Sequence, residues 1–263
     1  MTLPPPITLI TDFGLTGPYV ASMKGVILGI SPQSAIVDIT HAIQPQNIQQ
    51  AAFVLDAVLP YFPAGTIHVV VVDPGVGSER RPIAVFTERA CFVGPDNGVF
   101  SRVYRDENVR DIRHLRNPDY HLPAVSYTFH GRDIFAPVAA HLAAGVSPSV
   151  LGPTIADPVT IPFPTPEQLP DGSIRGQIIY ADAFGNLISN IPRQWLDSRT
   201  DWTFEIAETA ITGLSVTYSD VQPGDFVALG GSAGLVEIAQ RNGSAARHLN
   251  VDAGETLIVR PAS

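Results

Sequence analysis

The 263-residue sequence contains a single cysteine, Cys91, which excludes an internal disulfide and any metal site built from several cysteines. Basic residues are also scarce. Only 16 Lys and Arg stand against 25 Asp and Glu, giving a net charge of −9. This balance disfavours a nucleic-acid surface, because phosphates need clustered Lys and Arg. No stretch approaches the roughly 20 apolar residues of a membrane helix. Residues 1–6 lack the basic and apolar regions of a signal peptide. We therefore expect a cytoplasmic protein.

What the sequence does contain is typical of a folded chain with a large core. Hydrophobic residues make up 45% of the sequence and charged residues 16%. These proportions argue against disorder. The length suits one large or two modest domains. The 24 prolines and 22 glycines predict many sharp connections rather than a long helical bundle.

The first 150 residues alternate between short apolar runs and helical periodicity. The predicted strands are 7–10, 35–39, 67–72, 83–86 and 91–93, and the predicted helices are 18–30, 47–62 and 133–144. The run at 67–72 is apolar at nearly every position, as expected of a parallel strand covered on both faces. The alternation predicts an α/β domain with a mostly parallel sheet.

The pattern changes near residue 157. The segment 157–170 is rich in proline and has no periodicity, which is typical of a linker. Short β-like runs follow at 174–180, 202–206, 226–229 and 256–259, separated by turn sequences. We predict an N-terminal α/β domain over 1–160, a proline-rich linker over 161–172 and a smaller C-terminal all-β barrel over 173–263.

Three short motifs resemble known sites but lack the rest of their signatures. The triplet at 12–14 reads Asp-Phe-Gly, without the glycine-rich loop and catalytic loop of protein kinases. The segment 75–78 lacks the Gly-Lys-Ser/Thr ending of a phosphate-binding loop. The segment 230–234 fits G-x-S-x-G, but it lies in the β region and no histidine follows Asp252. We interpret Cys91 as a buried core thiol.

Two aspartates follow apolar strands in the N-terminal half. Ligands of parallel α/β sheets bind beyond the carboxyl ends of the strands, where Asp12 and Asp73 are expected. A carboxylate there suits the two hydroxyls of a ribose, a role that fits Asp12. The alternative is that each aspartate only caps the following turn.

The loop after Asp73 also carries Arg80 and Arg81, and a later loop carries His130 before a glycine. Asp, Arg and His at loop ends of one sheet would form a set able to activate water. The alternatives are a surface ion pair and a structural histidine. The segment 94–98 is a tight turn.

In the β region, the segment 180–187 contains Asp182, Phe184 and Asn186. Asn186 has the groups to read the edge of a purine, and Phe184 the ring to stack on its face. A β-bulge with a core phenylalanine is the alternative interpretation.

These segments together resemble one family, the S-adenosyl-L-methionine hydroxide adenosyltransferases, which hydrolyse S-adenosylmethionine to adenosine. The family is related to fluorinating and chlorinating enzymes that use the same substrate. The resemblance covers nearly the whole chain. It is carried by T-D-F-G at 11–14, M-K-G at 23–25, V-D-P-G-V-G at 72–77, G-P-D-N-G at 94–98, F-H-G-R-D at 129–133, D-A-F-G-N at 182–186 and L-V-E-I-A at 235–239.

The resemblance implies an N-terminal α/β domain, a C-terminal β-barrel and a homotrimer. Each active site would then lie between the N-terminal domain of one subunit and the C-terminal domain of its neighbour. The family's catalytic set matches Asp73, Arg80 and His130. Its substrate-binding residues match the following positions: Asp12, Asp182, Phe184, Asn186, Ser232 and Glu237.

Two positions depart from the family pattern at the methionine end of the substrate. Many relatives carry an aspartate where this chain has Gly17, and the last motif begins with Gly231 instead of asparagine. We expect Asp182 to carry more of the contact with the methionine ammonium.

The resemblance implies an in-line attack of activated water on the ribose C5′ that yields adenosine and L-methionine. Asp73 orients the water, His130 accepts its proton or positions it, and Arg80 holds Asp73. We expect no metal and no cofactor, with S-adenosylmethionine as the substrate. Two alternatives remain open. One is a halide-using relative, although those enzymes carry a tyrosine where Asp73 stands. The other is a non-catalytic nucleoside sensor, which has no use for the Asp-Arg-His set.

Overall fold

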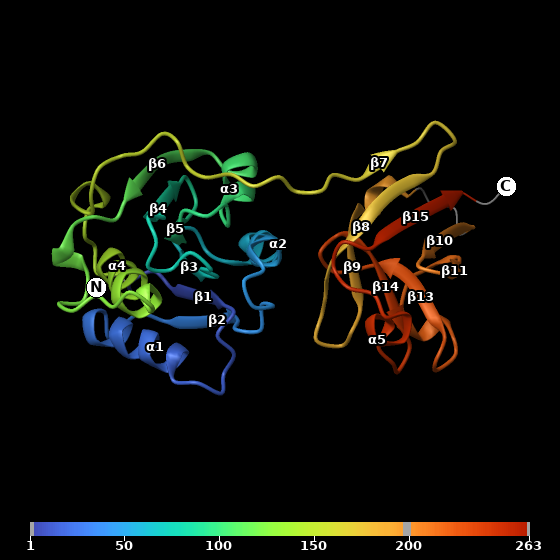
Figure 1. Cartoon of the computed structure of the whole chain (residues 1–263), viewed down its shortest axis with the longest axis horizontal. Coiled ribbons are helices and arrows are strands. Elements are labelled where there is room, and N and C mark those ends of the chain that lie inside the picture. Colours follow the sequence, from blue (N-terminus) through green and yellow to red (C-terminus); the bar gives the residue numbers. More distant parts are fainter. Residues whose placement is uncertain (1–2, 197–200, 262–263) are drawn as a thin grey trace. The chain divides into compact units, whose positions relative to one another are not determined.

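The computed structural model describes residues 3–196 and 201–261. The chain divides into two compact units, Met1–Ile161 and Pro162–Ser263 (Figure 1). Within the described residues, no helix is both long and apolar enough to cross a membrane.

The N-terminal unit is built on a six-stranded sheet with the order β2-β1-β3-β5-β4-β6. Its strands are β1 (Ile7–Thr11), β2 (Ile36–Thr40), β3 (Ile67–Val71), β4 (Pro82–Thr87), β5 (Cys91–Pro95) and β6 (Val109–His114). Parallel pairing joins β2 to β1, β1 to β3 and β3 to β5. In contrast, β4 pairs antiparallel with both β5 and β6. The predicted mostly parallel sheet is confirmed, with an antiparallel edge.

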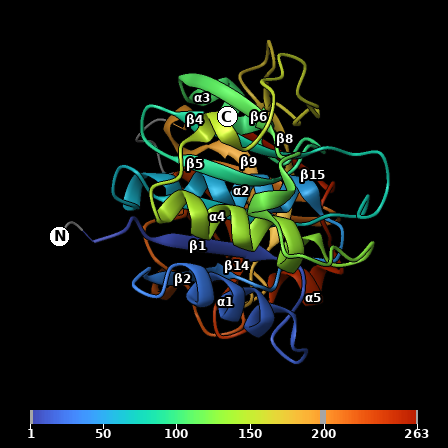
Figure 2. The same cartoon turned by 90° about the vertical axis from the view of Figure 1, so that its left-hand side faces the viewer.

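Helices cover both faces of this sheet. Its four α-helices are α1 (Tyr19–Ile30), α2 (Ile48–Val58), α3 (Ser101–Asp106) and α4 (Ala136–Ala143). One hydrophobic cluster joins α1 and α4 to the sheet, for example through Met23 and Val138. A second cluster joins α2 and α3 to the opposite face, through Leu55 and Val103. Figure 2 shows α1 and α4 side by side on the same face.

The strand order reverses between β1 and β3. The crossover through α1 leads from β1 to β2 on one side, and the crossover through α2 returns to β3 on the other side. Thr11 at the end of β1 lies opposite Val71 at the end of β3. The residues that follow these two strands therefore emerge together at the carboxyl edge, where doubly wound sheets bind ligands.

The helices begin and end where local chemistry requires it. Asn47 caps α2 by accepting a hydrogen bond from the backbone N–H of Gln50 at 2.8 Å. The predicted helix over 47–62 is α-helical only to Val58 and then becomes a 3-10 turn, η1 (Leu59–Tyr61). Pro60 has no N–H to continue the α-helical pattern.

The predicted helix over 133–144 also differs from the structure. It begins earlier as a single π-helical turn, η3 (Gly131–Phe135), which leads into α4. Pro137 cannot donate the α-helical bond to the carbonyl of Asp133, and that carbonyl instead accepts from the backbone N–H of Leu122 at 2.9 Å. Such turns are common at functional sites.

The C-terminal unit is one curved, all-strand sheet. Its strands are β7 (Glu167–Gln168), β8 (Ile174–Ala181), β9 (Leu187–Pro192), β10 (Trp202–Ile206), β11 (Thr209–Thr212), β12 (Leu214–Ser215), β13 (Phe226–Gly230), β14 (Leu235–Gln240) and β15 (Thr256–Pro261). The order runs from β11 through β10, β15, β8, β9, β14 and β13 to β12. Only Gly213 separates β11 from β12 along the chain, so the two ends of the sheet meet. The expected barrel is therefore nearly closed, around residues such as Phe204 and Ile238.

Several elements have no counterpart among the predicted ones. They are α3, β6, β9, β11, β12, β14 and the short helix α5 (Ala245–Leu249). The segment predicted to be a linker, 161–172, contains β7, which pairs with β8. The residues just before β7 are hydrogen-bonded to the rest of the N-terminal unit. The backbone N–H of Val159 donates to the Asp96 carboxylate at 2.8 Å, and the backbone N–H of Ile161 donates to the Ser101 hydroxyl at 2.9 Å.

Candidate active site

Asp73, Arg80 and His130 contact one another directly. The Nε of Arg80 donates to Oδ1 of Asp73 at 2.9 Å, and its Nη2 donates to Oδ2. The same Nη2 lies 2.7 Å from Nδ1 of His130. The side chains of Arg80 and Asp73 are only 8% and 5% exposed. The sequence separates Arg80 and His130 by 50 positions, and the fold brings them together at the carboxyl edge of the sheet.

Two glycines allow the loops that carry these residues to pack closely. Gly77 has a φ of +79°, and a Cβ there would lie 2.4 Å from the carbonyl oxygen of Tyr127. A Cβ on Gly131 would lie 3.3 Å from Sδ of Met23 and 3.4 Å from Cγ1 of Val71. Glycine at position 77 therefore lets the loop after β3 rest against the loop before η3.

The contact with Arg80 determines the protonation of the His130 ring. A guanidinium has only donors, so Nδ1 of His130 accepts, and the proton of the neutral ring is on Nε2. Burial and the charge of Arg80 lower the pKa of His130 below 6.5. Asp73, Asp133 and a hydrogen bond with the Ser126 backbone act in the opposite direction. The neutral ring is thus held as an acceptor for Arg80.

An aromatic ring lies against the Arg80 guanidinium. Its Cζ lies 5.3 Å from the centroid of Phe135 in the π-helical turn. Its Nη1 is buried and has no hydrogen-bond partner among the described residues. A cation placed against a ring and bonded to a carboxylate is held rigidly, and both N–H groups of Nη1 are unused among the described residues.

Asp12 follows β1 at the same edge of the sheet. Its Oδ2 accepts a hydrogen bond from the backbone N–H of Gln46 at 2.8 Å. Gln46 has a φ of +67°, which is unusual for a residue with a side chain. The backbone N–H that fixes Asp12 thus comes from a strained residue just before α2, and strain of this kind gathers at functional sites.

Arg81 points away from this set, although it adjoins Arg80. It pairs with the buried Asp96 at 2.6 Å and with the exposed Asp157 at 2.8 Å. Asn97 donates to the carbonyl of Val72 at 2.9 Å. The turn at 94–98 therefore holds the loop after β3 and the residues leading out of the N-terminal unit.

In the C-terminal unit, Asp182, Phe184 and Asn186 form the loop between β8 and β9. Oδ1 of Asp182 accepts from the N–H groups of Phe184 and Asn186, both at 2.9 Å, and Oδ2 accepts from Nδ2 of Asn186 at 3.0 Å. Gly185 takes the positive φ of +84° that this turn requires. The ring of Phe184 is 79% exposed, so it is not the core residue that one interpretation expected.

Glu237 lies in β14 and is buried. Its Oε1 accepts a hydrogen bond from the hydroxyl of Tyr218 at 2.6 Å. Burial raises the pKa of Glu237, the Tyr218 hydrogen bond opposes this, and nearby Asp182 adds to it. Burial and Glu237 in turn raise the pKa of Tyr218 to about 12. Sequence reasoning did not identify Tyr218, which begins the short 3-10 helix η6 (Tyr218–Asp220) and belongs to none of the motifs.

Ser232 is exposed in the turn that joins β13 to β14. The strand register places this turn at the opposite end of β14 from the Asp182 loop, because Leu235 pairs with Pro192 and Ile238 with Leu187. The three intervening steps correspond to about 10 Å along the strand. Ser232 does not follow a strand that enters a helix, so the G-x-S-x-G match is not a nucleophile elbow.

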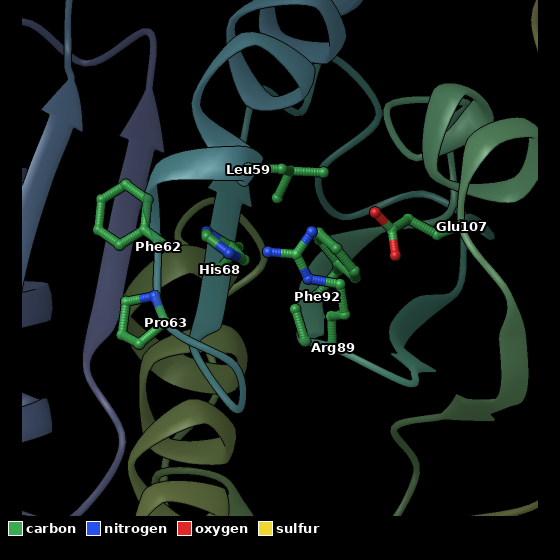
Figure 3. A pocket seen from close by; sticks show the side chains of 8 residues that line it. Leu59, Phe62, Pro63, His68, Arg89, Phe92 and Glu107 are labelled. Atoms are coloured by element: carbon green, nitrogen blue, oxygen red, sulfur yellow. The ribbon is translucent and has the colours of Figure 1, made fainter.

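A small pocket lies elsewhere in the N-terminal unit (Figure 3). The pocket is lined by His68 of β3 and Phe92 of β5, whose ring centroids are 5.3 Å apart in a stacked arrangement. Arg89 and Glu107 also line it. Burial lowers the pKa of His68 to about 4. His68 is near the start of its strand, so this pocket is at the amino edge of the sheet, away from Asp12 and Asp73.

Neither metal ligands nor a reactive thiol accompany the site in the part of the chain that the structure describes. No group of three or more His, Cys, Asp or Glu side chains there is placed to hold a metal ion. Cys91 is buried at the start of β5, and burial raises the pKa of its thiol. The interpretation of Cys91 as a core residue is confirmed.

The chain matches both domains of one family along most of its length. Residues 7–152 match the SAM hydroxide adenosyltransferase N-terminal domain, and residues 176–258 match the C-terminal domain of the same family. The chain belongs to the SAM hydroxide adenosyltransferase family. The resemblance inferred from the motifs is thereby confirmed for both units.

Individual members of the SAM hydroxide adenosyltransferase family align over nearly the full chain. An (R)-S-adenosyl-L-methionine hydrolase of Thermus thermophilus is 39% identical, covering 95% of this chain and 97% of the relative. A fluorinase of Nocardia brasiliensis is 26% identical, covering 97% of both chains. A solved structure of an uncharacterized protein from Thermotoga maritima has a TM-score of 0.89 and 34% identity, covering 96% of this chain and 99% of its own.

Both glycines that depart from the SAM hydroxide adenosyltransferase pattern are crowded. A Cβ on Gly17 would lie 3.0 Å from Cδ2 of Tyr19, and a Cβ on Gly231 would lie 2.7 Å from Oε2 of Glu237. A larger side chain at either position would require its neighbour to move. At both positions that depart from the family pattern, a neighbouring side chain of this protein therefore occupies the space that a larger residue would need.

The structure brings some predicted site residues together within each unit. Asp73, Arg80 and His130 are in contact, and Asp182 bonds to Asn186. Sequence reasoning did not identify the residues that support them, namely Gln46, Ser126, Asp133, Phe135 and Tyr218. Asp133 is the last residue of the F-H-G-R-D motif and Ser126 lies three residues before that motif, so their proximity to His130 was a usable signal. The positive φ of Gln46 has no signature in the sequence.

Proposed function

We propose that this protein hydrolyses S-adenosyl-L-methionine to adenosine and L-methionine. The observation that carries the proposal is the buried contact of Asp73 with Arg80 and His130, beside Asp12, at the reversal of strand order. Family membership and the hydrolase name of the 39% identical relative support it. S-adenosylmethionine is the substrate, and the mechanism needs no further cofactor.

The chemistry follows from the substrate. Its sulfonium is already positive, so methionine leaves without a general acid. Water attacks C5′ in line, the C5′–O bond forms, and the C5′–S bond breaks with its electron pair going to sulfur. We infer that Asp73 orients the water and receives its proton, which then passes to solvent. Arg80 holds Asp73 in a site drier than bulk, where a fixed charge acts strongly.

The geometry favours a positioning role for His130 over that of proton acceptor. Its Nδ1 accepts from Nη2 of Arg80 at 2.7 Å, and burial and the charge of Arg80 lower the pKa of the ring. Asp12 has one carboxylate oxygen bonded to Gln46, and it offers its other acceptor positions to the ribose hydroxyls.

The C-terminal residues suit the two ends of the same substrate. The exposed ring of Phe184 is suited to stack on adenine, with Asn186 at the purine edge. Ser232, in the turn at the other end of β14, and Glu237, whose Oε2 lies beside Gly231 of that turn, would receive the methionine portion. Asp182 already accepts three hydrogen bonds, and its remaining lone pairs would contact the ammonium.

Assembly is the second part of the proposal. We infer a homotrimer in which each site combines the N-terminal unit of one subunit with the C-terminal unit of its neighbour. The observation behind it is that the polar motifs divide between the units, while one nucleoside needs both. We further predict a cytoplasmic location and neither nucleic-acid nor membrane partners, on the acidic composition.

Product analysis after incubation with S-adenosylmethionine tests the reaction. We expect adenosine and methionine in equal amounts, with ¹⁸O from labelled water in the adenosine 5′-hydroxyl. A halo-deoxyadenosine formed in the presence of halide would identify a halide-using enzyme instead. Bound but intact substrate would identify a sensor.

Subunit complementation tests the assembly. Asp73→Asn and Asn186→Ala chains, each first shown to be inactive alone, are dissociated, mixed and reassembled. Some interfaces then pair an intact N-terminal unit with an intact C-terminal unit, so activity partly returns. If the mixture stays inactive although mass spectrometry detects mixed oligomers, both halves of the site belong to one subunit.

A further inference from the structure

A chain of hydrogen bonds leads from the interior of the N-terminal unit to the candidate catalytic set. The side chain of Asp133 is 0% exposed. Its Oδ2 accepts from the backbone N–H of Ser126 at 2.8 Å and from the Ser126 hydroxyl at 2.7 Å. The Ser126 hydroxyl accepts from the backbone N–H of Phe129, the residue next to His130, at 3.1 Å. The Ser126 backbone acts to raise the pKa of the His130 ring. His130 in turn accepts from Arg80, which holds Asp73.

The loop that contains these residues is closed on itself. The Ser126 hydroxyl accepts from the N–H of Phe129 at 3.1 Å, and the carbonyl of Phe129 accepts from the N–H of Asp133 at 3.1 Å. The carbonyl of Asp133 also holds Leu122. Asp133 therefore fixes both the position and the direction of the Ser126 backbone.

A fully buried carboxylate is costly unless it is paired with an opposite charge and hydrogen-bonded. Among the described residues, Asp133 has one ion-pair partner, Arg132, whose side chain is 38% exposed. Its carboxylate hydrogen bonds to Ser126 lead toward the loop that carries His130. The proposed reaction does not use either Asp133 or Ser126 directly.

We propose that Asp133, acting through Ser126, is the positioning residue that holds the His130 ring against Arg80. This inference rests on the proposed hydrolysis for its kinetic consequence. Neither residue touches the substrate. Their effect is on the geometry of the Asp73–Arg80–His130 set.

The charged and titratable groups that face His130 come from several loops. They are Arg80 and Asp73 after β3, Asp133 in the π-helical turn, and His121, whose own pKa is lowered by burial and by His130. The carboxylate of Asp133 raises the pKa of His130. Its removal should therefore move the titration of His130 to lower pH.

Three variants and one control test the proposal kinetically. Asp133→Asn removes the charge, Ser126→Ala removes the hydroxyl donor, and Ser126→Thr keeps it. Arg132→Gln is the matched control, because it removes the other partner of Asp133 and leaves Ser126 in place. A displacement of about 1 Å in a catalytic group can cost about 100-fold in rate. We expect kcat to fall about 30-fold for Asp133→Asn and about fivefold for Ser126→Ala.

The controls and KM separate positioning from loss of folding. We expect KM to change less than about twofold in all variants and Ser126→Thr to recover most of the lost kcat. Arg132→Gln should keep the wild-type kcat per folded molecule while lowering the melting temperature, because it leaves the buried Asp133 without its ion-pair partner. A lower melting temperature with unchanged kcat per folded molecule in Asp133→Asn would show that Asp133 only stabilises the fold, and would overturn the proposal.

An NMR titration of the histidine rings decides the matter without activity. We expect the His130 midpoint to fall in Asp133→Asn and to stay unchanged in Arg132→Gln. An unchanged midpoint in Asp133→Asn would refute the coupling between Asp133 and His130. If the wild type forms no adenosine, the proposed function fails, whereas the titration still tests the positioning of His130.

Discussion

In the N-terminal unit, polar side chains of the candidate site bond across long stretches of sequence, as between Arg80 and His130. In the C-terminal unit they bond mainly within one loop, as between Asp182 and Asn186, and Phe184 stays exposed. The first arrangement fixes charges in a site shielded from water. The second presents an aromatic ring that has no partner in its own unit among the described residues. We interpret the first as the reaction site and the second as the recognition surface.

The largest expected effect would come from removing the charge at the reaction site. Asp73→Asn should lower kcat by about 100- to 1,000-fold, because it keeps the shape but not the charge that orients water. Adenosine affinity, measured by calorimetry, should change little. Asp157→Asn is the matched control, since it breaks an exposed pair with Arg81. Near-normal turnover in Asp73→Asn would mean that the N-terminal unit does not hold the reaction site, and would contradict the comparison of the two units.

Lowering the pH should change the free energy of unfolding of the two units in opposite directions, through His68 in the N-terminal unit and Glu237 in the C-terminal unit. The folded pKa of His68 is about 4 against an ordinary 6.5, so its contribution to stability is complete above pH 6.5 and is lost as pH falls towards 4. The loss is about 3 kcal/mol. Glu237 has a raised pKa, so its contribution is complete at low pH and is lost as pH rises through its folded pKa.

Hydrogen exchange followed separately in each unit between pH 4 and 7 checks this prediction. His68→Gln should flatten the acid loss in the N-terminal unit, and Glu237→Gln should flatten the opposite trend in the C-terminal unit. Identical pH profiles for wild type and both variants would contradict it.

Binding by the N-terminal unit should depend on Asp12. Asp12→Ala removes an acceptor for the ribose hydroxyls and should weaken adenosine binding by about tenfold or more, from about 1.5–3 kcal/mol per charged hydrogen bond. Calorimetry measures the affinity. Because the change also frees the N–H of Gln46, the melting temperature is measured alongside. Unchanged affinity would mean that Asp12 is only a turn cap.

The smallest expected effect concerns the recognition surface. Phe184→Ala should reduce adenosine affinity by about fivefold, since aromatic pairs are worth about 1 kcal/mol beyond burial. Stability should not change, because the ring is exposed. Val216→Ala, also at an exposed position in the same unit, is the control. If both substitutions leave binding unchanged, the exposed ring serves another purpose.

Much of the N-terminal sheet could be predicted from the sequence. Strands such as β3 are apolar throughout because both faces are covered, and that pattern is visible without a structure. The barrel strands β9 and β14 were not predicted as strands. Polar residues such as Asn190 and Glu237 interrupt their apolar runs, and both are buried in the fold.

The sequence by itself determined which residues stand at the carboxyl ends of β1 and β3, because apolar runs and the aspartates that follow them are local features. It also carried the family motifs of both units. Only the tertiary structure decided that Arg80 turns towards Asp73 and Arg81 away from it, and that Asp133 supports His130 through Ser126. These outcomes depend on the close packing of loops distant in sequence, which no local pattern of residues records.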